Sequence, residues 1–374
     1  QPPLLEILRI GAYQILFLDK IPDSAAVNTS VELAKLSKRG QASGLVNAVL
    51  RKISQNKESL PPSPVRDEVQ RLSIQYSHPK WLTKRMVNLL GREEAERFLA
   101  SNNEIAPLAI QVNPLKTTTE SLTEELRQAG IEVHPHAWVP DCLELSGTGD
   151  LTALPAFREG KFLVQDPAAR LVSLIADIKP GQTVLDVCAA PGGKSLSAAF
   201  AMEGQGSILS CDLHENKLKR IQESARRLGV DIIDTHAADG RVFHPEWEAA
   251  FDTVLVDAPC SGLGIIRKKP DTRYKKADDL FTLPVIQAAI LDNAARYVRL
   301  GGTLVYSTCT IDPAENQQQI AAFLQRHPEF TVCAPDVPLP AGMTAGEHGC
   351  LSVPTRTGMD GFFLCVLQKA AGTQ

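Results

Sequence analysis

Two cysteines of the chain each follow an apolar, strand-like segment. Residues 302–309 read GTLVYSTC and end in Cys309, while residues 252–258 read DTVLVDA and are followed two positions later by Cys260. A free cysteine is most often a small buried residue, so either one alone would be interpreted as inert. A thiolate, however, is a strong nucleophile and a good leaving group. Two thiols at matched strand ends therefore favour a chemical role.

A glycine-rich turn lies between another strand-like segment and a helix that we expect to begin near Ser195. Residues 186–195 read DVCAAPGGKS; a nucleoside triphosphate loop needs glycine where Cys188 stands, and the dinucleotide pattern G-x-G-x-x-G is absent. The remaining interpretation is a nucleoside ligand without a pyrophosphate, and S-adenosylmethionine fits that description. We predict that this cofactor contacts the turn residues Cys188, Ala189, Ala190, Pro191, Gly192, Gly193 and Lys194.

Three aspartates follow successive strand-like segments and support the same interpretation. Asp212 ends the second segment, Asp239 the third and Asp257 the fourth. A carboxylate about twenty residues past the glycines can bind ribose hydroxyls, which suits Asp212, and we expect Asp239 near the adenine end of the ligand. A lone aspartate would more simply be a helix cap or turn residue. The series of three favours a binding role.

The elements that must position these residues alternate regularly from about residue 161 onward. Short β-branched runs at 183–189, 206–212, 231–239, 252–258 and 302–309 are separated by segments of helical length. This alternation predicts an α/β fold with a parallel, doubly wound sheet, which binds ligands outside the carboxyl ends of its strands. The fourth and fifth strands should be neighbours, so Cys260 and Cys309 should face one crevice. Spacing alone leaves open which of the two thiols attacks.

The chain before residue 161 is organised differently. Helical spacing of apolar residues over 4–18, 25–36 and 42–53 predicts a small all-α bundle, and the polar, proline-containing stretch after it indicates a linker. Helical and then mixed patterns follow. We predict a helical domain at 1–60, a linker at 61–77, a helical plus small α/β module at 78–160, and the doubly wound domain at 161–374. The chain begins at Gln1 inside a helical pattern, so we expect further residues before it.

Composition limits the class of protein. Hydrophobic residues make up 44% and charged residues 22% of the 374 positions, as in ordinary globular proteins. No apolar stretch reaches the roughly 18 residues of a membrane span, and no secretion signal is present, so we expect a cytoplasmic protein without a membrane partner. The eight cysteines include no C-x-x-C pair, which argues against zinc and against a disulfide framework.

A net charge of −4 does not by itself indicate a nucleic-acid partner. Evidence for a nucleic-acid partner must therefore come from local basic clusters at 35–40, 51–52 and 266–276. Each cluster alone would be interpreted as a solvated surface. The third cluster directly follows the Cys260 turn. We predict that its residues Arg267, Lys268 and Lys269 hold nucleic-acid phosphates beside the site.

Several of these segments resemble one known family. The motifs DVCAAPGGK, VDAPCSGLG, IRKKPD, VYSTCTIDPAEN and GMDGFF, in this order over roughly residues 160–368, are similar to those of the RNA (cytosine-5)-methyltransferases. Residues AAVNTSVELAK and GLVNAVLRK resemble the bundle, similar to the antitermination factor NusB, that is attached to the bacterial Fmu/Sun (RsmB) branch. That branch modifies small-subunit (16S) ribosomal RNA.

The resemblance implies a Rossmann-like, S-adenosylmethionine-dependent methyltransferase. It assigns attack on carbon 6 of a cytosine to Cys309, leaves Cys260 to assist elimination, and places Asp257 against the base or the methionine part of the cofactor. Independently of the family, carbon 5 of cytosine becomes nucleophilic only after such an addition, which explains the need for a thiolate. We expect a monomer, no metal, and a single-stranded or extruded target cytosine.

Three alternatives stay open. The substrate could be a cytosine of tRNA or of large-subunit ribosomal RNA. The chain could be an RNA-binding factor of the antitermination type with an idle methyltransferase domain, which the intact Cys260, Cys309 and Asp257 argue against. It could also be a DNA methyltransferase that uses Cys260, because a cysteine after proline at the fourth strand attacks in those enzymes.

Overall fold

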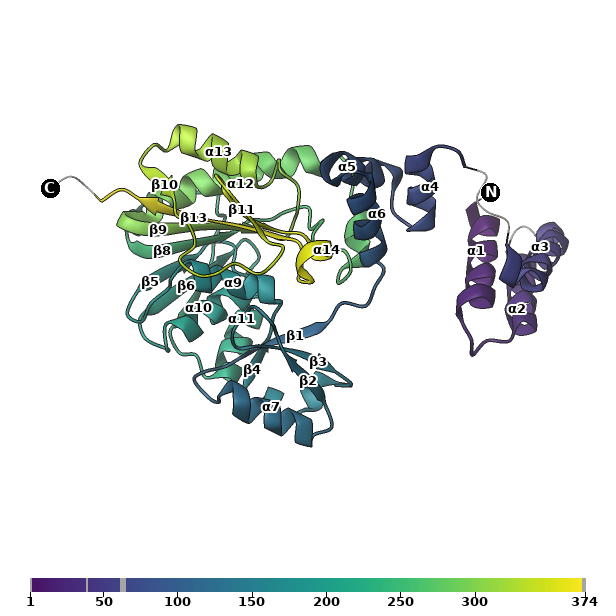
Figure 1. The fold of residues 1–374 in the computed structure, drawn as a ribbon, viewed down its shortest axis with the longest axis horizontal. Helices are drawn as coiled ribbons and strands as arrows, with labels where there is room; N and C mark the ends of the chain where they lie inside the picture. Colours follow the sequence, from purple (N-terminus) through teal and green to yellow (C-terminus); the bar gives the residue numbers. More distant parts are fainter. Residues whose placement is uncertain (1, 38–39, 61–64, 372–374) are drawn as a thin grey trace. The chain divides into compact units, whose positions relative to one another are not determined.

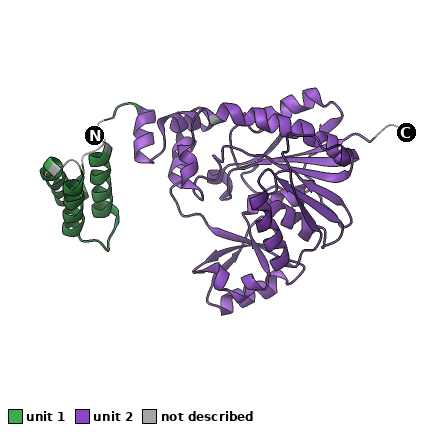
Figure 2. Cartoon of the chain, turned by 180° about the vertical axis from the view of Figure 1, so that it is seen from behind, with its two compact units in different colours: residues 1–67 green, residues 68–374 purple. Residues whose placement is uncertain are grey.

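A computed structural model describes residues 2–37, 40–60 and 65–371. The chain forms two compact units, residues 1–67 and residues 68–374 (Figure 2). Lys38 and Arg39 of the first basic cluster, and residues 61–64 of the expected linker, lie outside the described residues. The division of the chain into four parts stays a prediction. None of the described helices is long and apolar enough to cross a membrane.

The first unit is a three-helix bundle, as predicted. It contains α1 (Pro2–Phe17), α2 (Asp23–Leu36), η1 (Gly40–Ala42), α3 (Ser43–Gln55) and η2 (Lys57–Ser59). Apolar residues at helical spacing form its core, which includes Ile15, Val27, Val46 and Leu50. A Cβ added at Gly11 would lie 2.5 Å from Leu50 Cδ1, so this glycine allows α1 and α3 to approach closely.

The second unit begins with three helices, α4 (Glu68–Gln75), α5 (Lys80–Leu90) and α6 (Arg92–Ser101). Of these, α5 and α6 pack on loops of the large sheet domain. Buried residues of α5 and α6, including Met86 and Phe98, form one core cluster with Ile266 and Ile311. These helices therefore support the loops that follow the strand ends.

A small antiparallel sheet follows, in the order β2-β3-β1-β4. Its elements are β1 (Leu108–Val112), α7 (Thr119–Gln128), β2 (Glu132–Pro135), β3 (Cys142–Ser146), η3 (Leu151–Ala153), α8 (Pro155–Arg158) and β4 (Phe162–Val164). The sequence analysis predicts a helical plus small α/β module over 78–160 but does not assign β4, because three residues are too short to show a period. β4 pairs with β1 through Ile110 and Val164.

The large sheet confirms the predicted doubly wound arrangement (Figure 1). Its parallel strands are β5 (Thr183–Asp186), β6 (Ser207–Asp212), β7 (Ile233–Ala237), β8 (Phe251–Asp257) and β9 (Val298–Thr308). They lie in the order β7-β6-β5-β8-β9, so the chain reverses direction across the sheet at β5 and β8. The connecting helices are α9 (Pro167–Ile175), α10 (Gly193–Ala201), α11 (Glu215–Leu228), α12 (Asp279–Tyr297) and α13 (Gln317–Arg326), with η4 (Pro245–Trp247) and η5 (Pro270–Tyr274).

Antiparallel strands that the sequence analysis did not assign extend this sheet beyond β9. β13 (Phe362–Lys369) pairs with β9, and β10 (Phe330–Val332), β12 (Gly349–Ser352) and β11 (Thr344–Gly346) complete that edge, with α14 (Pro354–Thr357) before β13. β13 begins directly after the GMDG turn. The C-terminal segment thus brings that turn to the same end of the sheet as Cys309.

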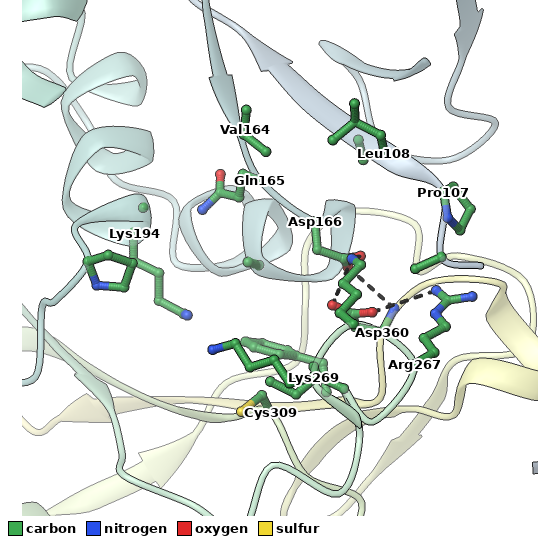
Figure 3. A pocket seen from close by; sticks show the side chains of 18 of the residues that line it. Pro107, Leu108, Val164, Gln165, Asp166, Lys194, Arg267, Lys269, Cys309 and Asp360 are labelled. Atoms are coloured by element: carbon green, nitrogen blue, oxygen red, sulfur yellow. Dashed lines mark hydrogen bonds and ion pairs between the residues drawn. The ribbon is translucent and has the colours of Figure 1, made fainter. Parts of the chain in front are cut away.

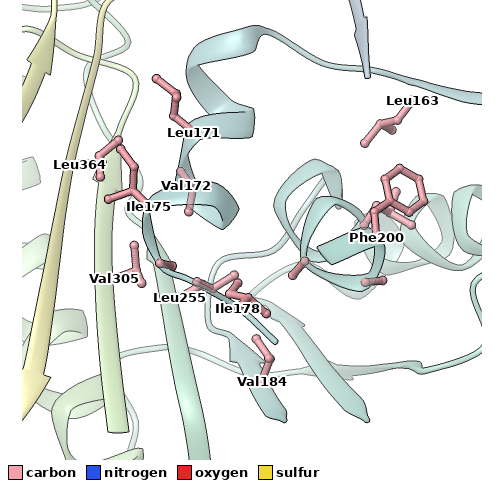
Figure 4. Packing of buried hydrophobic residues seen from close by; sticks show 14 of the residues in the cluster. Leu163, Leu171, Val172, Ile175, Ile178, Val184, Phe200, Leu255, Val305 and Leu364 are labelled. Atoms are coloured by element: carbon pink, nitrogen blue, oxygen red, sulfur yellow. The ribbon is translucent and has the colours of Figure 1, made fainter. Parts of the chain in front are cut away.

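Both faces of the large sheet are buried. Leu255 and Val305 pack with α9 residues such as Leu171 and Val172 on one face (Figure 4), whereas the adjacent residues Val254, Val256 and Leu304 pack with α12 on the other. This explains why the strands are continuous apolar runs. Polar side chains that act on a ligand must therefore lie at the strand ends and in the loops that follow.

Asn113 offers a test of how the small sheet is fixed to the large domain. Its fully buried side chain donates 2.8 Å hydrogen bonds to Gly160 O and to Leu228 O. We predict that Asn113→Leu lowers the free energy of unfolding by about 2–3 kcal/mol, because two buried carbonyls lose their donor. Denaturant unfolding of the full chain measures this change. The exposed Gln128→Ala on α7 serves as the control, with an expected change within about 0.5 kcal/mol.

Candidate active site

The site lies where the sheet reverses direction, at the carboxyl ends of β5 and β8. In a doubly wound sheet the loops after two such strands leave toward opposite faces and open a crevice. The turn 187–192 follows β5, and the segment from Ala258 onward follows β8. Ala258 N–H donates to Ser307 O at 2.9 Å, so the loops after β8 and β9 leave the sheet together.

The glycine-rich turn is fixed by hydrogen bonds within the fold. Ser195 donates to the buried Asp186 Oδ2 at 2.6 Å, and Ala189 N–H donates to Cys211 O at 2.7 Å. Gly192 has a φ of +106°, and an added Cβ would lie 3.1 Å from Ile221 Cγ1, which explains the glycine. Burial raises the pKa of Asp186 to about 7. The helix α10 begins at Gly193, two residues before the predicted Ser195.

Two cavities meet at this crevice. The larger cavity, of about 760 Å³, is lined by residues that include Gln165, Asp166, Lys194, Arg267, Asp360 and Phe362 (Figure 3). The smaller cavity, of about 500 Å³, is lined by residues that include Cys188, Ala190, Asp212, Asp239 and Cys260. Asp257, Ile265, Lys269 and Cys309 line both cavities. A ligand in each cavity would therefore approach the other beside Cys309.

The two cysteines are brought together. Cys260 Sγ lies 3.1 Å from Cys309 Sγ, and both residues are partly exposed. The surrounding loops are held by Gly264 N–H, which donates to Cys309 O at 3.0 Å, and by a 2.8 Å hydrogen bond between Ser261 and Thr310 hydroxyls. Cys309 directly follows β9, whereas Cys260 lies three residues past the end of β8.

The two thiols have different electrostatic environments. The hydrogen bond from Cys260 lowers the pKa of Cys309, and the positive charges of Lys194 and Lys269 lower it further, against the opposing effect of burial. The same hydrogen bond and burial raise the pKa of Cys260 well above its ordinary value, with a contribution from Glu315. Cys309 is therefore the thiol of the pair that ionises more readily.

Lys194 and Asp257 form an ion pair at this junction. Lys194 Nζ lies 2.7 Å from Asp257 Oδ2, and Ser307 donates to Asp257 Oδ1 at 3.0 Å. Burial opposes the charge of Lys194, but Asp257 raises its pKa, so it stays a cation. Figure 3 shows Lys194 and Lys269 extending into the larger cavity near Cys309.

The predicted RNA-binding cations divide into two kinds. Lys268 pairs with Asp166 and, at 2.9 Å, with Asp360, while Arg267 donates to Gly358 O at 2.6 Å and lies 3.6 Å from Asp360. Lys269 has no side-chain partner among the described residues. Arg267 and Lys268 are thus already engaged with protein groups, and Lys269 is the cation of the three that is available to a ligand.

The predicted cofactor residues other than Gly192 line the two cavities. Cys188, Ala190, Asp212 and Asp239 line the smaller cavity; Ala189, Pro191, Gly193 and Lys194 line the larger one. Burial raises the pKa of Cys188, which argues for a structural thiol. Sequence reasoning missed Gln165, Asp166, Asp186 and Asp360, which also line the larger cavity. No pattern of spacing connects these residues.

Comparison with known proteins identifies the relatives of the chain. The model of the 16S rRNA methyltransferase RsmB/F family matches residues 173–368, a ferredoxin-like domain of RsmF/B-like methyltransferases matches 78–152, and the NusB family matches 1–55. The probable ribosomal RNA small subunit methyltransferase B of Bacillus subtilis is 40% identical, over 99% of this chain and 83% of that protein. Ribosomal RNA small subunit methyltransferase B of Salmonella typhi is 35% identical, over 97% and 81%.

A solved structure agrees with these matches. The crystal structure of a methyltransferase homologue from Pyrococcus horikoshii superposes with a TM-score of 0.71 at 26% identity, over 82% of this chain and 100% of that one. Fold and site together define a Rossmann-like, S-adenosylmethionine-dependent methyltransferase with a NusB-like domain and a ferredoxin-like module. More narrowly, the chain belongs to the RsmB/F family of RNA methyltransferases. The predicted fold class, family and cofactor are confirmed.

The residues of the smaller cavity suit S-adenosylmethionine. Asp212 Oδ1 accepts a 2.9 Å hydrogen bond from His214 N–H, whereas Oδ2 has no partner among the described residues and can accept from a ribose hydroxyl. Asp239 is oriented by Arg241, 2.6 Å away. Among the described residues no group of three or more histidine, cysteine, aspartate or glutamate side chains could hold a metal ion.

The charge of Lys194 provides a test of the thiol environment. We predict that Lys194→Met raises the pKa of Cys309, because a nearby cation is lost and Asp257 is left unpaired. The iodoacetamide reaction of Cys309 at neutral pH should then slow about tenfold, as measured by peptide mass spectrometry across a pH series. The exposed Lys179→Met is the matched control and should leave the rate unchanged; equal effects of both variants would contradict the assignment.

Proposed function

We propose that the chain methylates carbon 5 of a cytosine in small-subunit ribosomal RNA through a covalent adduct between Cys309 and carbon 6 of the base. The observation that carries this proposal is the junction of the two cavities at Cys309, whose pKa is lowered. The named relatives support the small ribosomal subunit as the source of the RNA.

The proposed reaction begins at the Cys309 sulfur. The thiolate forms a bond to carbon 6, and the electrons of the 5,6 double bond become available at carbon 5. When bound, S-adenosylmethionine would supply carbon 5 with an electrophilic methyl group, and the electrons of the broken carbon–sulfur bond would stay with S-adenosylhomocysteine. Carbon 5 then gives its proton to solvent, the electrons of that carbon–hydrogen bond form the double bond again, and the bond between sulfur and carbon 6 breaks. The thiolate of Cys309 is restored.

Neighbouring side chains suit the remaining steps. Cys260, 3.1 Å from Cys309, is placed to assist elimination as the sulfur leaves. Asp257 and Lys194, joined at 2.7 Å, can hydrogen-bond the polar edge of a base and stabilise the charge that develops on it. Asp257 and Lys194 line the larger cavity, which we assign to the base, while Asp212 and Asp239 mark the smaller cavity as the cofactor side.

The difference in pKa between the two thiols bears on the alternative of a DNA methyltransferase that attacks with Cys260. An enzyme that attacks with Cys260 would need that thiol to ionise first, whereas the pKa of Cys260 is raised and that of Cys309 is lowered. The environment therefore favours Cys309 as the nucleophile. We infer a single-stranded or extruded cytosine, because carbon 6 inside a stacked duplex cannot reach a sulfur at the base of a cavity.

Covalent trapping tests the nucleophile. We predict that RNA containing 5-fluorocytidine, with S-adenosylmethionine present, forms a stable adduct with the wild-type chain, because fluorine on carbon 5 cannot leave as a proton does. The adduct should be lost in Cys309→Ala and should persist in Cys260→Ala, as judged by denaturing gel electrophoresis. Loss in Cys260→Ala alone would exchange the two roles. Digestion with RNase or DNase identifies the nucleic acid.

The basic loop predicts different effects of two neighbouring lysines. Lys269→Ala should weaken RNA binding and reduce the dependence of the binding constant on salt by about 0.7 in slope, as expected when one phosphate contact is lost. Lys268→Ala should instead lower the thermal stability, since Asp166 and Asp360 lose their shared cation. Binding measured over several salt concentrations, with melting curves, separates the two. Equal salt slopes in both variants would contradict the assignment.

A further inference from the structure

Glu315 is a fully buried carboxylate directly behind the Cys260 turn. It lies in the loop between Cys309 and α13, and its side chain is 0% exposed. Its Oε1 atom is buried without a hydrogen-bond partner, and no cation forms an ion pair with it among the described residues. A buried, unpaired carboxylate destabilises a fold, so its presence here calls for an explanation.

The other oxygen of Glu315 fixes the turn that carries Cys260. Oε2 accepts hydrogen bonds from Ser261 N–H at 2.8 Å and from Gln287 Nε2 at 2.9 Å. Gln287, on α12, also donates to Pro259 O at 2.9 Å. Glu315 and Gln287 thus hydrogen-bond the backbone of Ser261 and Pro259, the residues on both sides of Cys260. Tyr306 holds Glu315 in turn by donating to its backbone carbonyl at 2.7 Å.

Charges around the two sulfurs are arranged unequally. The cations Lys194 and Lys269 lower the pKa of Cys309. Glu315 contributes to the raised pKa of Cys260, after the hydrogen bond to Cys309 and burial, and Asp257 acts on both thiols. Three more charged groups lie close by. Lys275 donates to the backbone carbonyls of Cys260 and Ser261. Arg85 pairs with Asp312 of the Glu315 loop, and Glu315 contributes to the raised pKa of Arg85.

We propose that Glu315 is a positioning residue that assigns the two cysteines their roles. It fixes the Cys260 turn, and its negative charge keeps the proton on Cys260, so that this thiol donates a hydrogen bond to a Cys309 sulfur that has released its proton to solvent. The unpaired oxygen is thereby explained, because a paired carboxylate would exert less charge on Cys260. This inference rests on the proposed function, in which Cys309 attacks.

The test measures thiol ionisation without RNA. In full-length Cys309→Ser and Cys260→Ser chains, the remaining site cysteine reacts with iodoacetamide over a pH series, and peptide mass spectrometry follows the rate. We expect Cys260 to show the higher pH midpoint of the two. Glu315→Gln should then speed the alkylation of Cys260 about tenfold at pH values below that midpoint, because the loss of one nearby negative charge lowers the pKa of that thiol. Cys309 should change less than about threefold.

The choice of variants separates charge from structure. A glutamine at 315 can still accept from Ser261 and Gln287 through its one carbonyl oxygen, so Glu315→Gln removes charge and keeps both hydrogen bonds. Gln287→Met is the matched control, since it removes a hydrogen bond to Glu315 and keeps the charge. An unchanged Cys260 profile in Glu315→Gln, or an equal shift in Gln287→Met, would overturn the proposal.

A second comparison does not depend on the folding of Glu315→Gln. A lower pH midpoint for Cys260 than for Cys309 in the two serine variants would also overturn the proposal. Failure of RNA trapping at Cys309 would contradict the proposed function while leaving these thiol profiles as they are, so the two failures can be told apart.

Discussion

The parallel pairing of β8 with β9 is the constraint on which the site depends. Its register sets Asp257 opposite Ser307, and the loops that follow bring Cys260 and Cys309 to 3.1 Å. A slip by one residue would turn every side chain of a strand to the opposite face of the sheet. Because apolar residues on both faces are buried, such a slip is strongly disfavoured. Packing of the core therefore fixes the distance between two sulfurs that lie outside it.

The other parts of the second unit complete the site around this pair. Leu108 of β1 and Val164 of β4 form part of the wall of the larger cavity, and Lys268 ties Asp166, before α9, to Asp360, before β13. The ferredoxin-like module and the antiparallel edge of the sheet thus enclose the space assigned to the base. Most residues that line the smaller cavity, which we assign to the cofactor, lie at or after the ends of β5, β6, β7 and β8.

Much of this arrangement could be predicted from the sequence, and the reasons for the misses are physical. β-Branched runs that alternate with helical segments predicted β5 to β9, and their order predicted that Cys260 and Cys309 would meet. The strands β4, β10, β11 and β12 are only three or four residues long and leave no periodicity. The partners of Lys268 stand 92 and 102 positions away along the chain, so a basic cluster could not be distinguished from an internal ion-pair network. The proposed role of Glu315 depends on the burial of its side chain, which the spacing of residues in the sequence does not indicate.

The central claim is that base and cofactor meet at Cys309 from opposite cavities. The structure of the chain trapped on RNA containing 5-fluorocytidine, with the cofactor product retained, tests it most directly. The account predicts a covalent bond from Cys309 Sγ to carbon 6, the base beside Lys194 in the larger cavity, and the nucleoside of the cofactor beside Asp212. A bond from Cys260, or a base in the cavity that contains Asp212 and Asp239, would contradict it.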